Sequence, residues 1–164
     1  MSFSIIAAVD TRLVIGNKND LPWGRIPADM KHFRTITAGH TVVMGQRTFE
    51  SIGSKPLPKR RNIILSNNPA FTADGCEIAH SIDEAKKLSA HDGEVFVIGG
   101  ASIFKQFLPF VETMYITFIE GNFEGDTYFP AIDPALWEKT SEEIVKPSPE
   151  NKYQLRFVIY KRKV

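Results

Sequence analysis

The sequence has little of several features that commonly define a protein class. Cys76 is the only cysteine, so an intramolecular disulfide and a cysteine-rich metal site are both excluded. The four histidines are scattered and show neither the HExxH motif nor paired-ligand spacing, so no metal site is expected. Twenty lysines and arginines against nineteen acidic residues leave a net charge of +1, and this balance gives no global field for nucleic acid or an anionic membrane.

Long hydrophobic runs are also missing. The run at residues 3–9 ends at Asp10, which makes it too short for a membrane helix, and no cationic leader precedes it. We therefore expect a cytoplasmic protein. A chain of 164 residues that is 43% hydrophobic is long enough for one core, so we expect a single domain over residues 1–164.

Short apolar runs rich in β-branched and aromatic residues predict strands that are buried on both faces, because their apolar residues follow one another without alternation. These runs lie at residues 3–9, 41–44, 62–65, 94–98 and 114–119. Helical patterns lie at residues 28–36, 48–52, 81–88 and 102–108, and the third opens with the capping-box pair Ser81 and Glu84. Residues 137–145 and 153–161 are predicted to form an antiparallel hairpin.

These elements predict an α/β fold. We expect a mostly parallel twisted sheet of about eight strands with an antiparallel C-terminal edge strand. About four helices should flank this sheet on both faces.

One carboxylate falls on the apolar stripe of a predicted helix. After Pro27, the side chains of Asp29, Met30, Phe33 and Ile36 share one face. Removing an unpaired carboxylate from water costs several kcal/mol, so Asp29 needs a compensating donor, and a ligand can supply it. The alternative is that the Asp29 carboxylate only interacts favourably with the positive end of the helix dipole, or caps backbone amides in the first turn.

The segment before this helix has the composition of a lid. Residues 16–24 are polar, begin and end with glycine, and contain one large aromatic residue, Trp23. Such a loop is typical of a mobile segment with a single anchor. Trp23 can equally be an ordinary aromatic residue that covers the surface.

Two predicted strands end in glycine immediately before a helix. Gly45 follows the strand at 41–44, and Gly99 with Gly100 follows the strand at 94–98. Such turns let backbone amides approach a phosphate at the positive end of a helix, so two of them in one sheet suggest a dinucleotide site. Each alone is also typical of a tight turn, and neither matches the GxGxxG or phosphate-loop motif.

Basic and polar residues accompany these turns. Arg47, with Ser66 and Asn67 after the next strand, can hold an extra phosphate, which favours NADP over NAD. In the basic segment 55–61, Arg60 can clamp a substrate carboxylate through a bidentate contact. Solvated surface is the alternative interpretation for each of these residues.

A series of short motifs follows a single order along nearly the whole chain. The motifs are Ile6-Ala7-Ala8, Val14-Ile15-Gly16, Leu21-Pro22-Trp23, Pro27-Ala28-Asp29 with Phe33, Met44-Gly45, Thr48-Phe49-Glu50-Ser51-Ile52-Gly53, Pro56-Leu57-Pro58 with Arg60 and Asn62, Val97-Ile98-Gly99-Gly100, and Glu124-Gly125-Asp126-Thr127 with Phe129-Pro130. In this order they resemble the dihydrofolate reductase family. Each motif alone is weak, whereas the joint order is specific.

The resemblance implies NADPH-dependent reduction of dihydrofolate to tetrahydrofolate, with hydride transfer to C6 and protonation of N5, in support of one-carbon metabolism. The implied catalytic residues are Asp29, which hydrogen-bonds the pterin, Thr117, which assists through water, and Leu21 and Trp23 of the lid. The implied substrate-binding residues are Ile6, Ala8, Asp29, Met30, Phe33, Ser51, Ile52, Leu57, Arg60, Ile98, Phe104 and Thr117. The implied cofactor-binding residues are Ala8, Ile15, Gly16, Asn19, Leu21, Gly45, Gln46, Arg47, Thr48, Leu65, Ser66, Asn67, Ile98, Gly99, Gly100, Ala101, Ser102, Ile103 and Phe104, with a cis peptide between Gly99 and Gly100.

Three residues depart from the pattern of the family. Gln46 stands where many relatives have a basic residue, Ser102 where some have arginine, and Phe104 where some bacterial members have tyrosine. The preference for NADP therefore depends on Arg47. The sequence has no obvious large apolar patch, so we expect a monomer. Diaminopyrimidine antifolates should bind through a charge-assisted pair between their protonated ring and Asp29, and no nucleic-acid, membrane or metal partner is expected.

Two other functions remain open at this stage. One is a reductase of the same fold that acts on another pteridine or on a pyrimidine. The other is a catalytically silent nucleotide-binding module, against which the intact Asp29, Thr117 and Gly99-Gly100 argue. Arg60 favours folate, because a substrate without a glutamate tail has no need of this cation.

Overall fold

Strands and helices alternate through most of the chain in a computed structural model that describes residues 1–18 and 20–164. Asn19, which was expected to bind cofactor, lies outside the described residues. The strands are β1 (Ser2–Asp10), β2 (Val14–Gly16), β3 (Thr41–Gly45), β4 (Arg61–Leu65), β5 (Glu77–Ala79), β6 (Glu94–Gly99), β7 (Val111–Ile119), β8 (Thr127–Tyr128), β9 (Trp137–Val145) and β10 (Leu155–Arg162). The helices are α1 (Pro27–Thr37), α2 (Gln46–Ser51), α3 (Ile82–Leu88) and α4 (Ala101–Phe107), and a 3-10 turn, η1 (Leu108–Phe110), follows α4.

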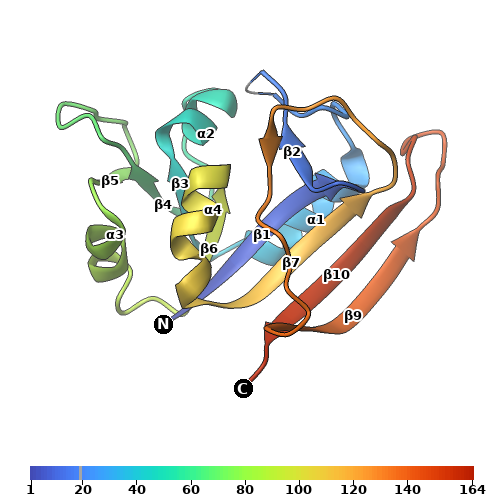
Figure 1. The fold of residues 1–164 in the computed structure, drawn as a ribbon. Helices are drawn as coiled ribbons and strands as arrows, with labels where there is room; N and C mark the ends of the chain where they lie inside the picture. The colour runs from blue at the N-terminus through green and yellow to red at the C-terminus, as the bar shows by residue number, and fades with distance from the viewer. Residues whose placement is uncertain (19) are drawn as a thin grey trace.

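Eight of the strands form one sheet in the order β5-β4-β3-β6-β1-β7-β10-β9 (Figure 1). All neighbours from β5 to β7 pair in parallel, whereas β10 pairs antiparallel with both β7 and β9. The predicted fold is confirmed. The antiparallel strand β10 lies between β7 and the edge strand β9, because the hairpin that joins them folds back outward.

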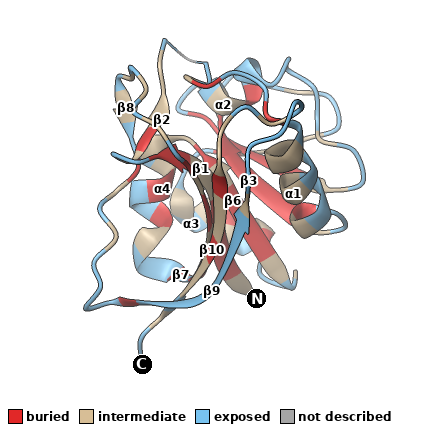
Figure 2. Ribbon diagram, turned by 90° about the vertical axis from the view of Figure 1, so that its right-hand side faces the viewer, coloured by how far each residue is buried: buried red, intermediate tan, exposed pale blue. Residues whose placement is uncertain are grey.

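The helices cover the two faces of this sheet, as Figure 2 shows with α1 on one side and α3 and α4 on the other. Adjacent residues of the central strands serve the two faces in turn. In β1, Ile5 packs in the cluster with Phe104 and Phe107 of α4, whereas Ile6 packs in the cluster that receives Phe33 of α1. Because both faces of these strands are buried, their sequences are continuous apolar runs. No helix of the described residues is long and apolar enough to cross a membrane.

Three short strands were not predicted. β5 pairs only with β4, and β2 and β8 form a separate two-stranded sheet. A strand of two or three residues is too short to show the hydrophobic pattern that predicts a strand, so the sequence evidence for it lies in the neighbouring residues. A Cβ added to Gly125 would lie 2.1 Å from Cγ1 of Val14 and 2.9 Å from the carbonyl oxygen of Gly16, so glycine is required there for β2 and the chain before β8 to approach.

A buried carboxylate fixes the turn between β1 and β2. Asp10 Oδ1 accepts hydrogen bonds from the backbone amides of Arg12 at 2.8 Å and Val14 at 2.9 Å. Its Oδ2 accepts from the amide of Phe123 at 2.9 Å. These three amides satisfy the carboxylate without any cation, and they hold β2 against the loop that follows β7.

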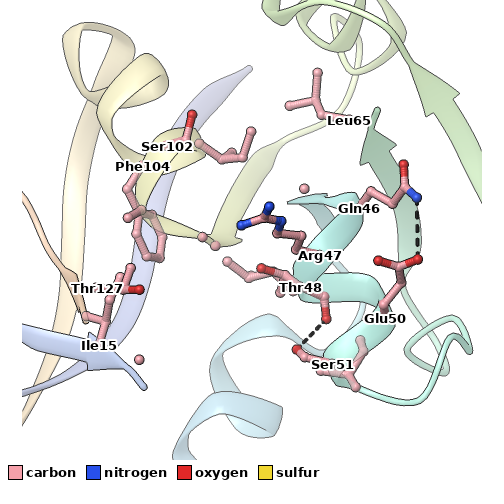
Figure 3. Close-up of a pocket in the computed structure, with 18 of the residues that line it drawn as sticks. Ile15, Gln46, Arg47, Thr48, Glu50, Ser51, Leu65, Ser102, Phe104 and Thr127 are labelled. Carbon is pink, nitrogen blue, oxygen red and sulfur yellow. Dashed lines mark hydrogen bonds between the residues drawn. The ribbon is translucent and has the colours of Figure 1, made fainter. Parts of the chain in front are cut away.

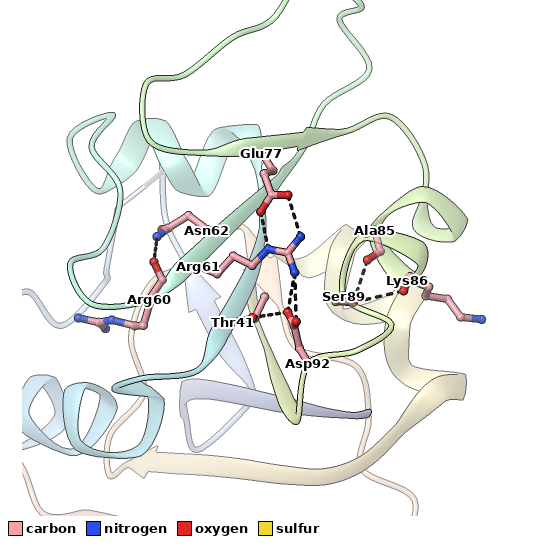
Figure 4. A network of polar contacts seen from close by, with 9 residues as sticks. All are labelled: Thr41, Arg60, Arg61, Asn62, Glu77, Ala85, Lys86, Ser89 and Asp92. Carbon is pink, nitrogen blue, oxygen red and sulfur yellow. Dashed lines mark hydrogen bonds and ion pairs between the residues drawn. The ribbon is translucent and has the colours of Figure 1, made fainter.

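An ion-pair network joins the amino ends of β3, β4 and β5 (Figure 4). Arg61 of β4 forms a bidentate pair with Glu77 of β5, and its Nη1 lies 2.9 Å from Oδ2 of Asp92. Asp92 also accepts from the hydroxyl of Thr41 in β3 at 2.5 Å. The network therefore ties together three neighbouring parallel strands at their amino ends.

The network predicts a pH-dependent contribution to stability. The hydrogen bond from Arg61 holds the pKa of Glu77 below its ordinary value of 4.5. A lowered pKa means that the stabilisation is present above pH 4.5 and is lost as the pH falls through the pKa of the folded state. Glu77→Gln should thus lower the free energy of unfolding by about 0.5–1 kcal/mol at neutral pH.

Urea unfolding of both proteins at neutral pH and at acidic pH checks this expectation. Glu112→Gln is the matched control, since Glu112 is exposed and has no ion pair within the described ranges. A difference between wild type and Glu77→Gln that persisted undiminished at acidic pH would contradict the role given to the pair.

Candidate functional site

A cleft of about 1150 Å³ opens where β3, β4 and β6 end. Figure 3 shows Arg47 and Thr48 of α2 on one side of it, with Ser102 and Phe104 of α4 on the other. Ligands of open α/β sheets bind in the crevice beyond the carboxyl ends of the strands. The cleft therefore lies where the topology of the sheet places a ligand.

Most of the residues expected to bind substrate or cofactor line this cleft. They are Ala8, Ile15, Gly16, Leu21, Phe33, Gly45, Gln46, Arg47, Thr48, Ser51, Ile52, Leu57, Leu65, Ser66, Asn67, Ile98, Gly99, Gly100, Ala101, Ser102, Ile103 and Phe104. The expected residues that do not line it are Ile6, Trp23, Asp29, Met30, Arg60 and Thr117.

The two glycine turns bring backbone to the floor of the cleft. Gly45 precedes α2 and Gly100 precedes α4, and neither helix has a side-chain cap. The peptide bond between Gly99 and Gly100 is cis, as the resemblance implies. Gly99 has φ +140°, and a Cβ built there would lie 3.2 Å from Oγ1 of Thr48, so a larger residue would be strained and crowded. The uncapped amides remain available to an anionic ligand.

Polar groups gather beyond α2, at the end of the cleft next to β4. Arg47 is exposed there, and the hydroxyl of Ser66 donates to Oε1 of Gln46 at 2.5 Å. The amide nitrogen of Gln46 in turn donates to Glu50 at 3.4 Å. Gln46 thus positions Ser66, and Arg47 supplies the positive charge.

Asp29 sits in the first turn of α1, and its carboxylate is partly buried. Burial raises the pKa of Asp29 above its ordinary value of 3.8, and a hydrogen bond with the Thr117 hydroxyl opposes that shift. Within residues 1–18 and 20–164, no lysine, arginine or histidine forms an ion pair with it, and no backbone amide donates to its side chain. Capping therefore does not explain this carboxylate.

Thr117 connects Asp29 to the cleft. It is buried in β7, where its Cα pairs with that of Ala8 in β1, and Ala8 lines the cleft. The aromatic ring of Phe33, one turn along α1 from Asp29, lines the same wall. Asp29 and Thr117 thus lie next to Ala8 and Phe33, which form part of the cleft wall.

Arg60 lies at the opposite end of α1. Its guanidinium carbon is 5.9 Å from the centroid of the Phe33 ring, and its Nη1 donates to Thr37 Oγ1 at 3.1 Å. Burial and, to a smaller extent, the charge of Arg34 lower the pKa of Arg60. The described residues supply no carboxylate to this cation, so its charge is available to a ligand at the rim.

The segment expected to act as a lid has one buried and one exposed large side chain. Trp23 is buried with Ile26 and packs edge-on against Phe123 at 5.6 Å between ring centroids. Leu21 is 50% exposed and lines the cleft. Trp23 is therefore an anchor and not a surface-covering aromatic, whereas closure of the lid stays a prediction.

Several residues that line the cleft were not expected from the sequence. They are Ala7, Asp20, Glu50, Asn68, His80, Ser81, Ile82, Gln106 and Thr127. Ser81 accepts the predicted capping hydrogen bond from the Glu84 amide at 3.0 Å. Its capping pattern predicts this structural role and does not indicate that Ser81 lines the cleft. Residues after the short strand β5 reach the cleft only because β5 pairs with β4, and that pairing had no signal in the sequence.

The raised pKa of Asp29 predicts the effect of removing its charge from the ligand-free protein. A raised pKa means that the folded state binds the proton more tightly, so ionisation of Asp29 costs stability above its folded pKa and costs nothing below 3.8. Asp29→Asn should therefore have a higher melting temperature than wild type at neutral pH, and this gain should shrink as the pH approaches 3.8. Thermal denaturation across pH checks it, and a variant less stable than wild type at neutral pH would contradict it.

Comparisons with known proteins identify the family of the chain. The sequence model of the dihydrofolate reductase family matches residues 2–162. The dihydrofolate reductase of Staphylococcus haemolyticus is 44% identical over 162 residues, which cover 99% of this chain and 96% of that protein. The one from Bacillus subtilis (strain 168) is 39% identical over 160 residues, covering 98% and 94%. Among solved structures, dihydrofolate reductase from Enterococcus faecalis complexed with NADP(H) and RAB-propyl has a TM-score of 0.94 at 36% identity and covers 99% of this chain and 97% of that one. The chain belongs to the dihydrofolate reductase family.

Proposed function

We propose that this protein catalyses the NADPH-dependent reduction of dihydrofolate to tetrahydrofolate. One observation carries the proposal: Asp29 is a partly buried carboxylate without a cationic partner in the described chain, and it lies one helical turn from Phe33, which lines a cleft suited to a dinucleotide. The pterin ring of dihydrofolate offers the N–H donors that such a carboxylate lacks. Family membership and the solved relative with NADP(H) support the same reaction.

The cleft fits NADPH in its shape and in its polar groups. The uncapped turns at Gly45 and Gly99-Gly100 hold the pyrophosphate through backbone amides, and Arg47 with Ser66 and Asn67 binds the 2′-phosphate. Ile15, Gly16 and Phe104 wall the nicotinamide end. When bound, NADPH supplies the hydride that is added to C6 of the pterin, while N5 receives a proton.

Asp29 binds and polarises the substrate. Its carboxylate accepts hydrogen bonds from the 2-amino group and a ring nitrogen of the pterin, with Thr117 assisting through a water molecule. The burial that raises its pKa also strengthens these hydrogen bonds, because water does not screen them. Asp29 orders the water that delivers the proton, and Leu21 on the closing lid excludes other water from the site.

The remaining substrate contacts follow the cleft wall outward. Ile6, Met30, Phe33, Ile52, Ile98 and Phe104 surround the pterin, and Leu57 contacts the aminobenzoyl group. Arg60, whose charge has no carboxylate partner among the described residues, binds the glutamate carboxylate. This contact favours folate over a pteridine or pyrimidine that lacks the tail.

The same site should bind diaminopyrimidine antifolates. Their protonated ring forms a charge-assisted hydrogen-bonded pair with the carboxylate of Asp29. We also propose that the protein acts as a monomer, since this chain alone supplies every residue to which we give a role.

Replacing the carboxylate tests the role of Asp29 in the reaction. Asp29→Asn keeps the size of the side chain and removes its charge, so kcat/KM for dihydrofolate should fall by about 10²–10⁴, the usual contribution of a positioned acid or base. The affinity for NADPH should stay within about twofold of wild type, since Asp29 does not line the cofactor cleft. Absorbance of NADPH measures turnover, and fluorescence titration measures binding. Near-normal turnover in the variant would overturn the role of Asp29.

Replacing Arg60 separates folate from the alternative substrates. Arg60→Gln should raise KM for dihydrofolate by about 10- to 100-fold, the range for a lost hydrogen bond to a charged group, and leave turnover of a dihydropterin without the tail unchanged. Arg25→Gln is the matched control, since Arg25 is an exposed cation outside the cleft lining. Equal activity of Arg60→Gln and wild type on dihydrofolate would favour the tail-free substrates.

A further inference from the structure

A second cavity, which we call the lateral pocket, lies on the same face of the sheet as α4. Phe104 of α4 and Trp137 of the pocket belong to one apolar cluster. The volume of the lateral pocket is about 650 Å³, which is in the usual range for a small-molecule site. Its lining residues are Leu13, Phe118, Ile132, Pro134, Trp137, Glu138, Lys139, Tyr160 and Lys163. None of them lines the cleft described above, so the two sites are separate.

The segment between β8 and β9 forms one wall of the lateral pocket. In Figure 1 this segment passes in front of β7 on its way to β9. At its start, the amide of Phe129 donates to the carbonyl oxygen of Leu13 at 2.8 Å. At its end, the carbonyl oxygen of Leu136 accepts from the amide of Lys163 at 2.8 Å. Ile132 lines the pocket from between these two hydrogen bonds, so this wall is fixed at both ends.

An irregularity in the pairing of the edge strand decides which side chains reach the pocket. The register of β9 against β10 shifts between Ile159 and Tyr160. Beyond the shift, Lys139 lies opposite Tyr160, and Trp137 is on the same side of β9 as Lys139. A shift of one residue exchanges the two faces of a strand. The irregularity therefore brings Trp137 and Lys139 to the face that carries Tyr160.

The charged side chains on this face are mainly cations. Glu138 lies between Trp137 and Lys139 in the strand, so its side chain points to the opposite face. There its Cα partner is Lys161, a residue of opposite charge. Lys139 and Lys163 therefore give the lateral pocket a positive charge.

Both of these lysines can bind an anion. Lys163 has no ion pair among the described residues. Nζ of Lys139 lies 2.9 Å from Oε2 of Glu142, and Nη1 of Arg156 lies 3.2 Å from the same oxygen. Arg156 therefore keeps Glu142 paired when Lys139 turns to a ligand.

Two uncharged donors complete the lining. Trp137 is 4% exposed, and neither its indole N–H nor the hydroxyl of Tyr160 forms a hydrogen bond with a described residue. In the part of the chain that the structure describes, no fully buried polar side-chain atom lacks a partner, so both groups reach accessible space. Burial raises the pKa of Tyr160, which keeps its hydroxyl protonated at neutral pH. Both side chains can therefore donate to an acceptor.

We propose that the lateral pocket binds a small aromatic carboxylate. A carboxylate only accepts hydrogen bonds, so it matches a lining with two ammonium groups, an indole N–H and a phenol hydroxyl. The rings of Phe118, Trp137 and Tyr160 favour an aromatic body, because rings pack against one another at their faces and edges. This inference goes beyond the proposed reaction and does not depend on it.

Titration of 2-naphthoate into the nitrogen-15-labelled protein, followed by NMR, tests the proposal. The neutral 2-naphthamide has the same ring system without the charge. The chain has two tryptophans, so the indole signal of Trp137 is assigned by its loss in Trp137→Phe. Lys139→Gln and Lys163→Gln each remove one cation of the pocket. Lys146→Gln is the matched control, since Lys146 is exposed and outside the pocket lining.

We expect 2-naphthoate to shift the indole signal of Trp137 with a dissociation constant below about 1 mM. Lys139→Gln and Lys163→Gln should each weaken binding about two- to fivefold, the range for an exposed ion pair, and Lys146→Gln should match wild type. The amide loses both contacts, so it should bind about 4- to 25-fold more weakly. Both pocket lysines are exposed, so their variants should keep the wild-type spectrum elsewhere.

Binding of the carboxylate in the substrate cleft is a separate outcome. Arg60→Gln should leave the shift of the Trp137 signal unchanged, because Arg60 does not line the lateral pocket. Loss of that shift in Arg60→Gln would overturn the proposal. Equal affinity for 2-naphthoate and 2-naphthamide would also overturn it, and so would the absence of a saturable shift at Trp137 up to about 1 mM.

Discussion

The site depends on one carboxylate that is withdrawn from water without a cation beside it. Asp10 and Asp29 are both withdrawn from water, Asp10 fully and Asp29 partly, and their carboxylates have different partners. Asp10 receives three backbone amides and is fully satisfied by the protein. Among the described residues only the Thr117 hydroxyl interacts with the carboxylate of Asp29, and burial raises the pKa of this group. The hydrogen bonds of Asp10 stabilise the fold, whereas the carboxylate of Asp29 can accept further hydrogen bonds from a ligand.

The order of the strands in the sheet places the Asp29 carboxylate near the ligand cleft. Parallel strands β3 and β6 end in glycine at the same edge, so their turns open one cleft, and the pairing of β1 with β7 places Thr117 beside Ala8, which lines this cleft. The network of Arg61 holds the amino ends of β3, β4 and β5 together, far from the ligand. The ion pairs of Arg61 thus lie away from the site, whereas Asp29 and Arg60 near the cleft have no ion-pair partner among the described residues.

Much of this could be predicted from the sequence, and the exceptions have physical reasons. Strands such as β1 and β7 are long apolar runs, and the hairpin of β9 and β10 has a clear turn, so their signals are local. β2, β5 and β8 are too short to show a period and exist through their partners. For the same reason the sequence gives no sign that His80 lines the cleft, because its place there follows from the pairing of β5 with β4. The apolar stripe of its helix marked Asp29 in the sequence, whereas the amide of Phe123 that completes the hydrogen bonding of Asp10 and the Thr117 hydroxyl beside Asp29 come from distant parts of the chain and have no local signal.

The most direct test of this account is the pKa of the Asp29 carboxyl group, measured by carbon-13 NMR in the ligand-free protein and in a complex with a diaminopyrimidine. The account predicts a pKa above 3.8 without ligand, because burial disfavours the charge. It predicts a lower pKa in the complex, because the protonated ring then supplies the missing donors. A ligand-free pKa at or below 3.8, or no change on binding, would show that this carboxylate is already satisfied by the protein.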